Sequence, residues 1–260
     1  MSTISVGTSG YTYHEWVGPL YPEGLAPAEY LPYYAAHFST LELNSTRYRM
    51  PTAAKLAHLH QQAPSLRFSI KAHRSFTTEI ASSWRSAVAA FSAAVQPLLH
   101  AGVLQAILLQ FPASFVYAPA ERRYLDSLLK CLSHLPLAVE FHHSLWYNNR
   151  TLDGLRQRKV SFVSLDLPAV DGVPPLLDTT TADLAYLRLH GRNATTWWAS
   201  DVASRYDYWY STEELKQIAQ RIRLLALESK QTLVYCNNHP KGAAVANART
   251  LATLLESDDG

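Results

Sequence analysis

Short apolar runs recur along this chain, and nearly all of them end in polar side chains. Longer stretches with a helical spacing of apolar residues separate them, an alternation typical of parallel β-strands joined by helices. The runs are Ile4–Gly7, Thr40–Asn44, Arg67–Lys71, Ala106–Gln110, Leu137–Glu140, Phe162–Asp166, Ala185–His190 and Leu233–Asn237. Eight runs match the strand number of a TIM-type (β/α)8 barrel, so we predict a single-domain α/β barrel of this type over residues 1–260.

The segments between the runs have the apolar spacing of amphipathic helices. The predicted helices are Glu29–Phe38, Thr52–Gln62, Ser82–Gln96, Ala120–Ser133, Leu152–Arg158, Thr212–Glu228 and Ala243–Leu255. Ser211 and Glu214 form a capping box at the start of the sixth of these. The stretch from Pro168 to Asp183 is rich in Pro and Thr, so we expect a short or irregular connection there.

An open doubly wound sheet and a membrane helix are the two alternatives for the architecture. Gly7 to Gly10 lack the GxGxxG spacing of a dinucleotide-binding turn, which favours the barrel. Residues 86–120 carry no charged side chain, but Pro97 and Pro112 divide them into pieces too short to span a bilayer. We therefore predict no membrane segment.

Composition excludes further classes. Hydrophobic residues make up 48% of the chain and charged residues 17%, and the net charge is +2, so neither disorder nor a polyanion-binding surface is indicated. Nucleic acid is unsupported as a partner, though not excluded. Cys131 and Cys236 lie in apolar segments without a CxxC spacing, and the first residues lack the pattern of a secretory signal. We expect buried thiols and a cytoplasmic location.

Polar side chains at the carboxyl ends of barrel strands meet at one mouth and form a shared site. Here they are Thr8, Ser9, Glu42, Asn44, Lys71, His73, Gln110, Glu140, His142, Asp166, Arg188, His190, Asn237 and Asn238. Residues two apart on a strand face the same side, which places Glu42 with Asn44 and Glu140 with His142. Neighbouring charges shift one another's pKa values, so the set favours an enzyme pocket over a salt-bridged plug that only closes the barrel.

We assign this pocket general acid–base chemistry on a small polar or anionic substrate, such as a phosphorylated molecule, with hydrolysis of a phosphoester or a glycoside favoured. In the catalytic set, Glu140 and Asp166 are acid and base, Lys71 and Arg188 hold negative charge, and His190 orients the substrate. The predicted substrate-binding residues are Glu42, Asn44, Gln110, His142, Asn237, Asn238 and Gly242.

Gly242 belongs to this set because loops after the last two strands of such barrels often bind phosphate. Free backbone N–H groups of residues 242–244 would meet an anion at the start of a helix, with Arg188 or Lys241 nearby. The alternative is that Gly242 only lets the loop turn.

Two other functions remain open. A divalent metal is possible as a cofactor, because Glu140, His142, Asp166, His190 and His239 are suitable ligand types, although no HExxH spacing occurs. Such a protein would be a metal-dependent hydrolase or isomerase. A non-catalytic carbohydrate- or nucleic-acid-binding protein is the third class, because the aromatic segment from Trp197 to Tyr210 offers stacking faces, unless it covers the mouth as a lid.

The strand-end motifs together resemble the YecE-like family, a domain of unknown function numbered seventy-two. The matching pieces are Gly7–Tyr11, Glu42–Asn44, Phe68–Ala72, Gln110–Pro112, Val139–Glu140, Ser144–Trp146, Asp166, Tyr186–Gly191, Asn237–Asn238 and Gly242–Ala243. The resemblance implies a barrel and carries no activity. The sequence departs from the family pattern at Arg47, where Phe is usual, at Thr78, where His is usual, and at His142, where Arg is usual.

Overall fold

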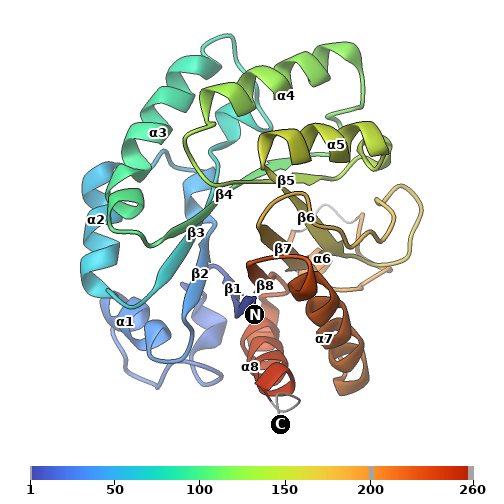
Figure 1. The fold of residues 1–260 in the computed structure, drawn as a ribbon. Helices are drawn as coiled ribbons and strands as arrows, with labels where there is room; N and C mark the ends of the chain where they lie inside the picture. The colour runs from blue at the N-terminus through green and yellow to red at the C-terminus, as the bar shows by residue number, and fades with distance from the viewer. Residues whose placement is uncertain (1, 199–201, 257–260) are drawn as a thin grey trace.

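Eight parallel strands pair in chain order and close into a barrel, because β1 also pairs with β8 (Figure 1). The computed structural model describes residues 2–198 and 202–256. The strands are β1 (Thr3–Ser9), β2 (Thr40–Leu43), β3 (Arg67–Lys71), β4 (Leu104–Phe111), β5 (Leu137–Phe141), β6 (Ser161–Asp166), β7 (Leu184–Leu189) and β8 (Gln231–Cys236). Each of the eight predicted runs is a strand, which confirms the TIM-type fold.

Helices surround the barrel (Figure 1). They are α1 (Tyr30–Ala35), α2 (Ala53–Gln62), α3 (Trp84–His100), α4 (Pro119–Cys131), α5 (Asn149–Arg158), α6 (Val202–Tyr206), α7 (Thr212–Leu227) and α8 (Ala243–Glu256). The capping box at Ser211 and Glu214 is present at the start of α7. The connection from β6 to β7 contains no helix, as its Pro and Thr content predicts.

Short 3-10 turns follow several strand ends and shape the mouth. They are His14–Trp16, Pro27–Glu29, Ser45–Arg47, Arg74–Phe76, Ser144–Trp146 and Pro240–Gly242. The turns that begin at Ser45, Arg74, Ser144 and Pro240 come shortly after the ends of β2, β3, β5 and β8, whereas Pro27–Glu29 leads into α1. The Ser45–Arg47 turn, for example, is held by Thr46 Oγ1, which donates to the backbone carbonyl of Lys71 at 2.6 Å.

Two layers of apolar side chains build the core. The inner layer fills the barrel with Ala106, Leu108, Ala138, Val163, Leu165, Tyr186, Leu233 and Tyr235, and the outer layer lies between strands and helices. Burial of each large side chain contributes about 1.5–3 kcal/mol. The two inner tyrosines close the barrel below the mouth, with ring centroids 5.2 Å apart. The Tyr235 hydroxyl is hydrogen-bonded to Thr40 and Ser69.

The close approach of β1 to β2 depends on Gly7. A Cβ at this position would lie 2.2 Å from the carbonyl oxygen of Thr40, which no side chain permits. The glycine therefore allows the first strand to pack tightly against the second, and this places Ser9 opposite Glu42 in the strand register.

Two expectations about local structure are wrong. We expected α3 to end before Pro97, but the helix continues to His100, because the buried residues Val95 and Leu98 keep one face of the last turn in the core. We also expected two buried thiols. Cys236 is buried, whereas Cys131 is exposed at the end of α4. No helix in the described part of the chain is long and apolar enough to cross a membrane.

Candidate active site in the barrel mouth

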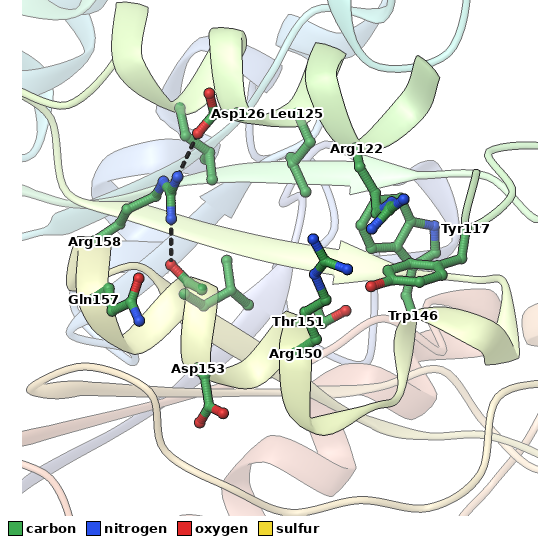
Figure 2. A pocket seen from close by; sticks show the side chains of 13 residues that line it. Tyr117, Arg122, Leu125, Asp126, Trp146, Arg150, Thr151, Asp153, Gln157 and Arg158 are labelled. Carbon is green, nitrogen blue, oxygen red and sulfur yellow. Dashed lines mark hydrogen bonds and ion pairs between the residues drawn. The ribbon is translucent and has the colours of Figure 1, made fainter. Parts of the chain in front are cut away.

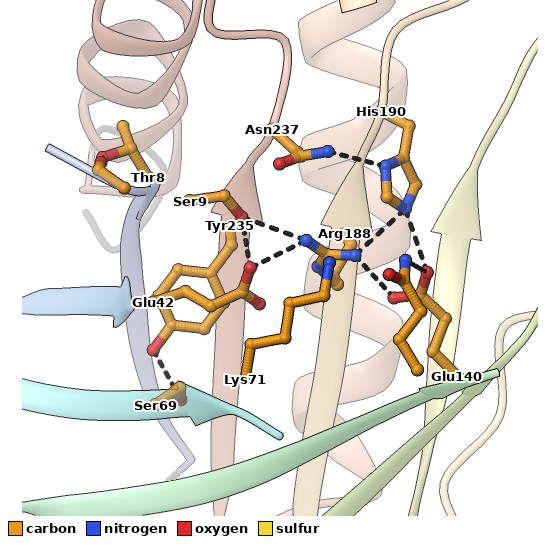
Figure 3. Close-up of polar contacts among 12 residues, drawn as sticks. Thr8, Ser9, Glu42, Ser69, Lys71, Glu140, Arg188, His190, Tyr235 and Asn237 are labelled. Atoms are coloured by element: carbon orange, nitrogen blue, oxygen red, sulfur yellow. Dashed lines mark hydrogen bonds and ion pairs between the residues drawn. The ribbon is translucent and has the colours of Figure 1, made fainter. Parts of the chain in front are cut away.

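Polar side chains from seven strands converge above the inner core (Figure 3). On each strand, the inward-facing side chains are apolar in the barrel interior and polar at the mouth. On β7 the inward-facing Tyr186 is followed by Arg188, and on β5 Ala138 is followed by Glu140. This two-residue alternation explains why the strand ends meet. The residues brought together are Ser9, Glu42, Lys71, Gln110, Glu140, Arg188, His190 and Asn237. All of them belong to the predicted strand-end set.

Arg188 lies at the centre of this cluster. Its side chain is completely buried and forms ion pairs with Glu42 and Glu140, both at 2.7 Å. The guanidinium group also donates to Ser9 Oγ at 3.3 Å. Burial alone would lower the pKa of Arg188, but the Glu140 and Glu42 carboxylates more than compensate and raise it above its usual value. The arginine is therefore a permanent cation that holds both carboxylates in place.

Glu42 is buried and held by three hydrogen bonds within the cluster. Its carboxylate accepts hydrogen bonds from Ser9 and, at 2.6 Å, from the hydroxyl of Tyr186, in addition to Arg188. The Tyr186 hydroxyl keeps its proton, because burial and the adjacent Glu42 carboxylate raise its pKa well above the usual value. We infer that Glu42 anchors Arg188 rather than contacts a ligand.

Glu140 connects the cluster to the two histidines. One oxygen binds Arg188, and the other contacts Gln110, His142 and, at 3.4 Å, His190. Burial alone would raise the pKa of this carboxyl, but Arg188 and the two imidazoles hold it well below its usual value. Glu140 is thus a fixed carboxylate at neutral pH and cannot supply a proton.

The two histidines differ in environment. His190 is buried, and its Nδ1 is 2.9 Å from the amide nitrogen of Asn237. Burial, and next the Arg188 charge, lower its pKa to about 4, so it is neutral near pH 7. His142 has 21% of its side chain exposed and is oriented by Glu140. It is the member of the pair that faces the open mouth.

Lys71 extends from the end of β3 toward Arg188 (Figure 3). Burial is the largest influence on its ammonium group, followed by the Arg188 charge, and together they lower its pKa to about 7. Glu42 and Glu140 act in the opposite direction but do not compensate. Within the described residues, the ammonium group makes no hydrogen bond or ion pair.

A cavity of about 410 Å³ opens above the cluster. It is lined by Tyr13, Asn44, Arg47, Tyr48, Lys71, Thr78, Gln110, Pro112, His142, Arg205, Tyr206, Asn237 and His239. Two of these are arginines and one is a lysine, and none of the described lining residues carries a carboxylate. Asn44 Oδ1 and Thr78 Oγ1 are buried atoms without a hydrogen-bond partner in the described structure. Such atoms in a cavity wall are suited to a polar ligand.

Asp166 does not belong to the cluster, which corrects its predicted position at the mouth. Val163 and Leu165 face the barrel interior, so Asp166 faces outward. Its carboxylate accepts two hydrogen bonds from Arg192, one from Arg221 and one from the Tyr210 hydroxyl. These contacts fill the carboxylate and fasten the β6 end to the segment after β7 and to α7.

Asn238 and Gly242 also lie outside the mouth cluster. Asn238 is buried and donates to the Tyr208 carbonyl and to Asn247, both at 2.8 Å. Gly242 has a φ of +78°, and a Cβ there would lie 2.6 Å from a Pro19 carbon. Its observed role is therefore the tight turn before α8, with Arg188 engaged elsewhere and Lys241 paired with Asp207 at 2.7 Å.

The sequence interpretation missed several cavity residues. Arg47 and Tyr48 come from the turn after β2, and Arg205 and Tyr206 come from α6, at a distance from any strand end. Only the aromatic segment after β7 gave a signal, and Trp197 and Tyr206 do lie beside His190, with ring centroids 6.4 and 5.7 Å away. Residues 199–201 of that segment lie outside the described structure.

A second hollow lies on the outer surface between α4 and α5 (Figure 2). Its volume of about 640 Å³ exceeds that of the mouth cavity, and Arg122, Arg150 and Arg158 lie around it. Arg158 is already paired with Asp126. None of the residues lining this groove belongs to the buried cluster. The convergence of shifted titratable groups instead favours the barrel mouth as the functional site.

Glu140, His142 and His190 form a group of potential metal ligands. One potential ligand atom from each residue lies within 4.8 Å of the others. A carboxylate with two imidazoles is a ligand set of catalytic zinc sites, which leave one position open. Neutral His190 and ionised Glu140 have the protonation states that a metal requires. Asp166 and His239, also expected as ligand types, are not part of the set.

Fold and site together define a TIM-barrel protein with a buried, charged mouth cluster below a cation-lined cavity. Residues 5–260 match the family model described as protein of unknown function DUF72, and the chain belongs to this family. This confirms the domain family, numbered seventy-two, that the strand-end motifs indicate.

Individual relatives extend this result. The chain is 27% identical over 270 residues to the UPF0759 protein YunF of Bacillus subtilis, covering 97% of this chain and 95% of that protein. A solved DUF72 family protein from Thermotoga maritima is similar with 35% identity and a TM-score of 0.90, covering 98% of this chain and 99% of that one. A DUF72 family protein from Enterococcus faecalis, at 24% identity and a TM-score of 0.88 with 98% and 96% covered, shares the fold.

The three positions at which the sequence analysis expects departures from the family pattern lie in one part of the structure. Arg47, Thr78 and His142 all line the mouth cavity, although they come from three different strand-end segments.

Proposed function

We propose that this protein is an enzyme that uses general acid–base chemistry on a small anionic molecule bound in the mouth cavity. The observation that carries the proposal is the cavity wall, which contains the basic side chains Arg47, Lys71 and Arg205 and, among its described residues, no carboxylate. A phosphorylated or carboxylated molecule would accept charge-assisted hydrogen bonds from basic side chains of this wall.

In this proposal His142 and Lys71 transfer protons. His142 is partly exposed to the cavity and is held in place by the Glu140 carboxylate. Lys71, with its pKa lowered to about 7, exchanges a proton near neutral pH. Glu140 is thus a positioning residue, which revises its predicted role as the acid.

The two favoured hydrolytic reactions fare differently. A glycosidase needs two carboxyl groups beside the sugar, one of them protonated. Here Glu42 and Glu140 are both bound to Arg188, and Asp166 faces away from the mouth. Glycoside hydrolysis loses support, whereas the cations lining the cavity favour phosphorylated substrates.

A ligand screen followed by matched variants tests the proposal. Phosphorylated metabolites and their uncharged analogues are added separately, and the thermal unfolding midpoint is recorded, because a ligand at 100 times its Kd stabilises by about 2.7 kcal/mol. We expect stabilisation by the anionic compounds only. Compounds that bind are then assayed for conversion by the wild type and by His142→Asn and His143→Asn.

His143 is the matched control, because it neighbours His142 but does not line the cavity and only caps a short turn. We expect turnover to fall about 10²- to 10⁴-fold in His142→Asn, the usual contribution of a general acid or base, and to stay unchanged in His143→Asn. Equal turnover in both variants would reject the assigned role. Tight binding without any conversion would indicate the non-catalytic class instead.

A metal-dependent hydrolase or isomerase is the second candidate, supported by the Glu140–His142–His190 set. Elemental analysis of protein purified without chelator, compared with His142→Asn, measures bound metal. We expect close to one bound ion in the wild type, and loss of it in the variant, if this candidate holds. Full turnover after complete removal of metal would refute it.

A further inference from the structure

Lys71 combines three properties that its role in proton transfer alone does not require. It is only 9% exposed, it lines the mouth cavity, and its ammonium group has no hydrogen-bond or ion-pair partner among the described residues. Buried lysines are ordinarily paired. The two carboxylates nearest to it are already occupied by Arg188 at 2.7 Å each. The amine thus borders the mouth cavity without a partner among the described residues.

The surroundings of Lys71 favour the neutral amine. Burial and the neighbouring Arg188 lower its pKa to about 7, with a smaller contribution from Arg47. A far larger fraction of the molecules then carries a free lone pair at neutral pH than the fraction of well under about 0.1% expected for an ordinary lysine. A lysine that is desolvated and placed beside another cation is the arrangement that activates this side chain as a nucleophile.

We propose that Lys71 forms an imine with the carbonyl group of a small anionic aldehyde or ketone bound in the mouth cavity. This inference rests on the proposed function for the anion-binding cavity and deepens it by naming the substrate class. The anionic group of the substrate lies toward Arg47 and Arg205, and its carbonyl carbon lies next to the Lys71 amine.

The chemical step balances without an external reagent. The neutral amine adds to the carbonyl carbon, and the carbonyl oxygen takes up a proton to give a carbinolamine. The oxygen then leaves as water with a second proton as the C=N bond forms, so both protons of the amine end on the water molecule. His142 is placed to deliver and accept these protons. The imine nitrogen then takes up one further proton, delivered from solvent through His142, and the resulting iminium ion withdraws electrons and acidifies the C–H bond next to it.

Reductive trapping tests this proposal on the whole wild-type chain. The protein is incubated near neutral pH with dihydroxyacetone phosphate or glyoxylate and sodium cyanoborohydride, which reduces an imine to a stable secondary amine. Uncharged dihydroxyacetone is the matched control compound. Peptide mass spectrometry then locates the label on each lysine. Lys71→Arg and Lys230→Arg are run in parallel, since Lys230 is a surface lysine paired with Asp183.

We expect Lys71 to be labelled at least about tenfold faster than the surface lysines, because its free-amine fraction is larger. The anionic carbonyl compounds should label it faster than the uncharged one. Lys71→Arg should lose this label, and Lys230→Arg should keep it. Labelling of Lys71 at the rate of the surface lysines, or without preference for anionic compounds, overturns the proposal.

The wild-type result stands even if Lys71→Arg does not fold, because the label is located residue by residue. The two proposals also fail separately. Stabilisation by phosphorylated compounds without selective labelling rejects the imine and leaves the proposed anion-binding enzyme intact. Absence of both stabilisation and labelling rejects both.

Discussion

Two charged clusters sit on opposite sides of the barrel wall. The inner cluster places two carboxylates, Glu42 and Glu140, on the single Arg188. The outer cluster places two arginines, Arg192 and Arg221, on the single Asp166. The side chains of the inner pairs are fully buried, whereas the outer side chains of Arg192 and Arg221 are 28% and 15% exposed.

This difference distinguishes a candidate reactive site from a cluster with a structural role. In the outer cluster every group has a complementary partner, and Arg221 also binds Asp178. The result is a link between β6, α7 and the segment after β7. In the inner cluster the pairs are equally fixed, but they leave Lys71 and His142 at the edge of a cavity. The salt bridges of the inner cluster therefore position the reactive groups without occupying all of them.

The largest expected effect comes from removing Arg188. Arg188→Met leaves two buried carboxylates without their cation, so the free energy of unfolding should fall by about 3–5 kcal/mol. Urea denaturation measures this change. The control is Arg156→Met, which removes an exposed pair with Asp153 and should alter stability within the small range of surface pairs. A loss in Arg188→Met no larger than in the control would show that the inner carboxylates are not dependent on Arg188.

A smaller effect is expected in the outer cluster. Asp166→Asn keeps a hydrogen-bonding side chain but removes the charge, and its arginines can hydrate, so we expect a loss of about 1–3 kcal/mol. Ligand stabilisation in the thermal-shift screen should be unchanged. If Asp166→Asn abolishes ligand binding while its unfolding is still cooperative, the separation of the two clusters is incorrect.

The smallest expected effect is a difference between the two clusters in how their contribution to the free energy of unfolding depends on pH. The folded pKa of His190 is lowered to about 4, so its stabilising contribution is present above its ordinary value near 6.5 and is lost as pH falls toward 4. The Asp166 pKa is also lowered, burial being outweighed by Arg192 and Arg221, and its contribution is lost only below its ordinary value. Mild acid should thus weaken the inner cluster first.

The free energy of unfolding, measured from pH 7 to pH 4 by urea titration, checks this order. His190→Asn should flatten the decline between about pH 6.5 and 4, whereas Asp166→Asn should leave this part of the curve unchanged. A flattening in Asp166→Asn instead would assign the early loss to the outer cluster.

The sequence was sufficient for the fold and for most of the inner cluster. Alternating apolar runs located all eight strands, and the two-residue period put Glu42, Glu140 and Arg188 on the inner face. The same period, applied to Leu165, would have turned Asp166 outward. Its placement at the mouth came from its position at the strand end alone, which does not determine the side it faces.

Other parts of the site depend on tertiary packing. Arg47 reaches the cavity because Thr46 ties its turn to the Lys71 carbonyl, and α6 brings Arg205 and Tyr206 over the mouth. Neither contact follows from local spacing. The protonation of Glu140 was also beyond the sequence, because it depends on how one arginine is shared between two carboxylates.

Closure of the barrel has a consequence for the nascent chain. The cluster takes Ser9 from the first strand and Asn237 from just after the last, and β1 completes its pairing only when β8 is present. During synthesis, a chain whose residue 237 has not yet emerged from the ribosome lacks the Asn237 amide that orients His190. Binding competence should therefore arrive in a single late step of synthesis, with no partially active fragment before it.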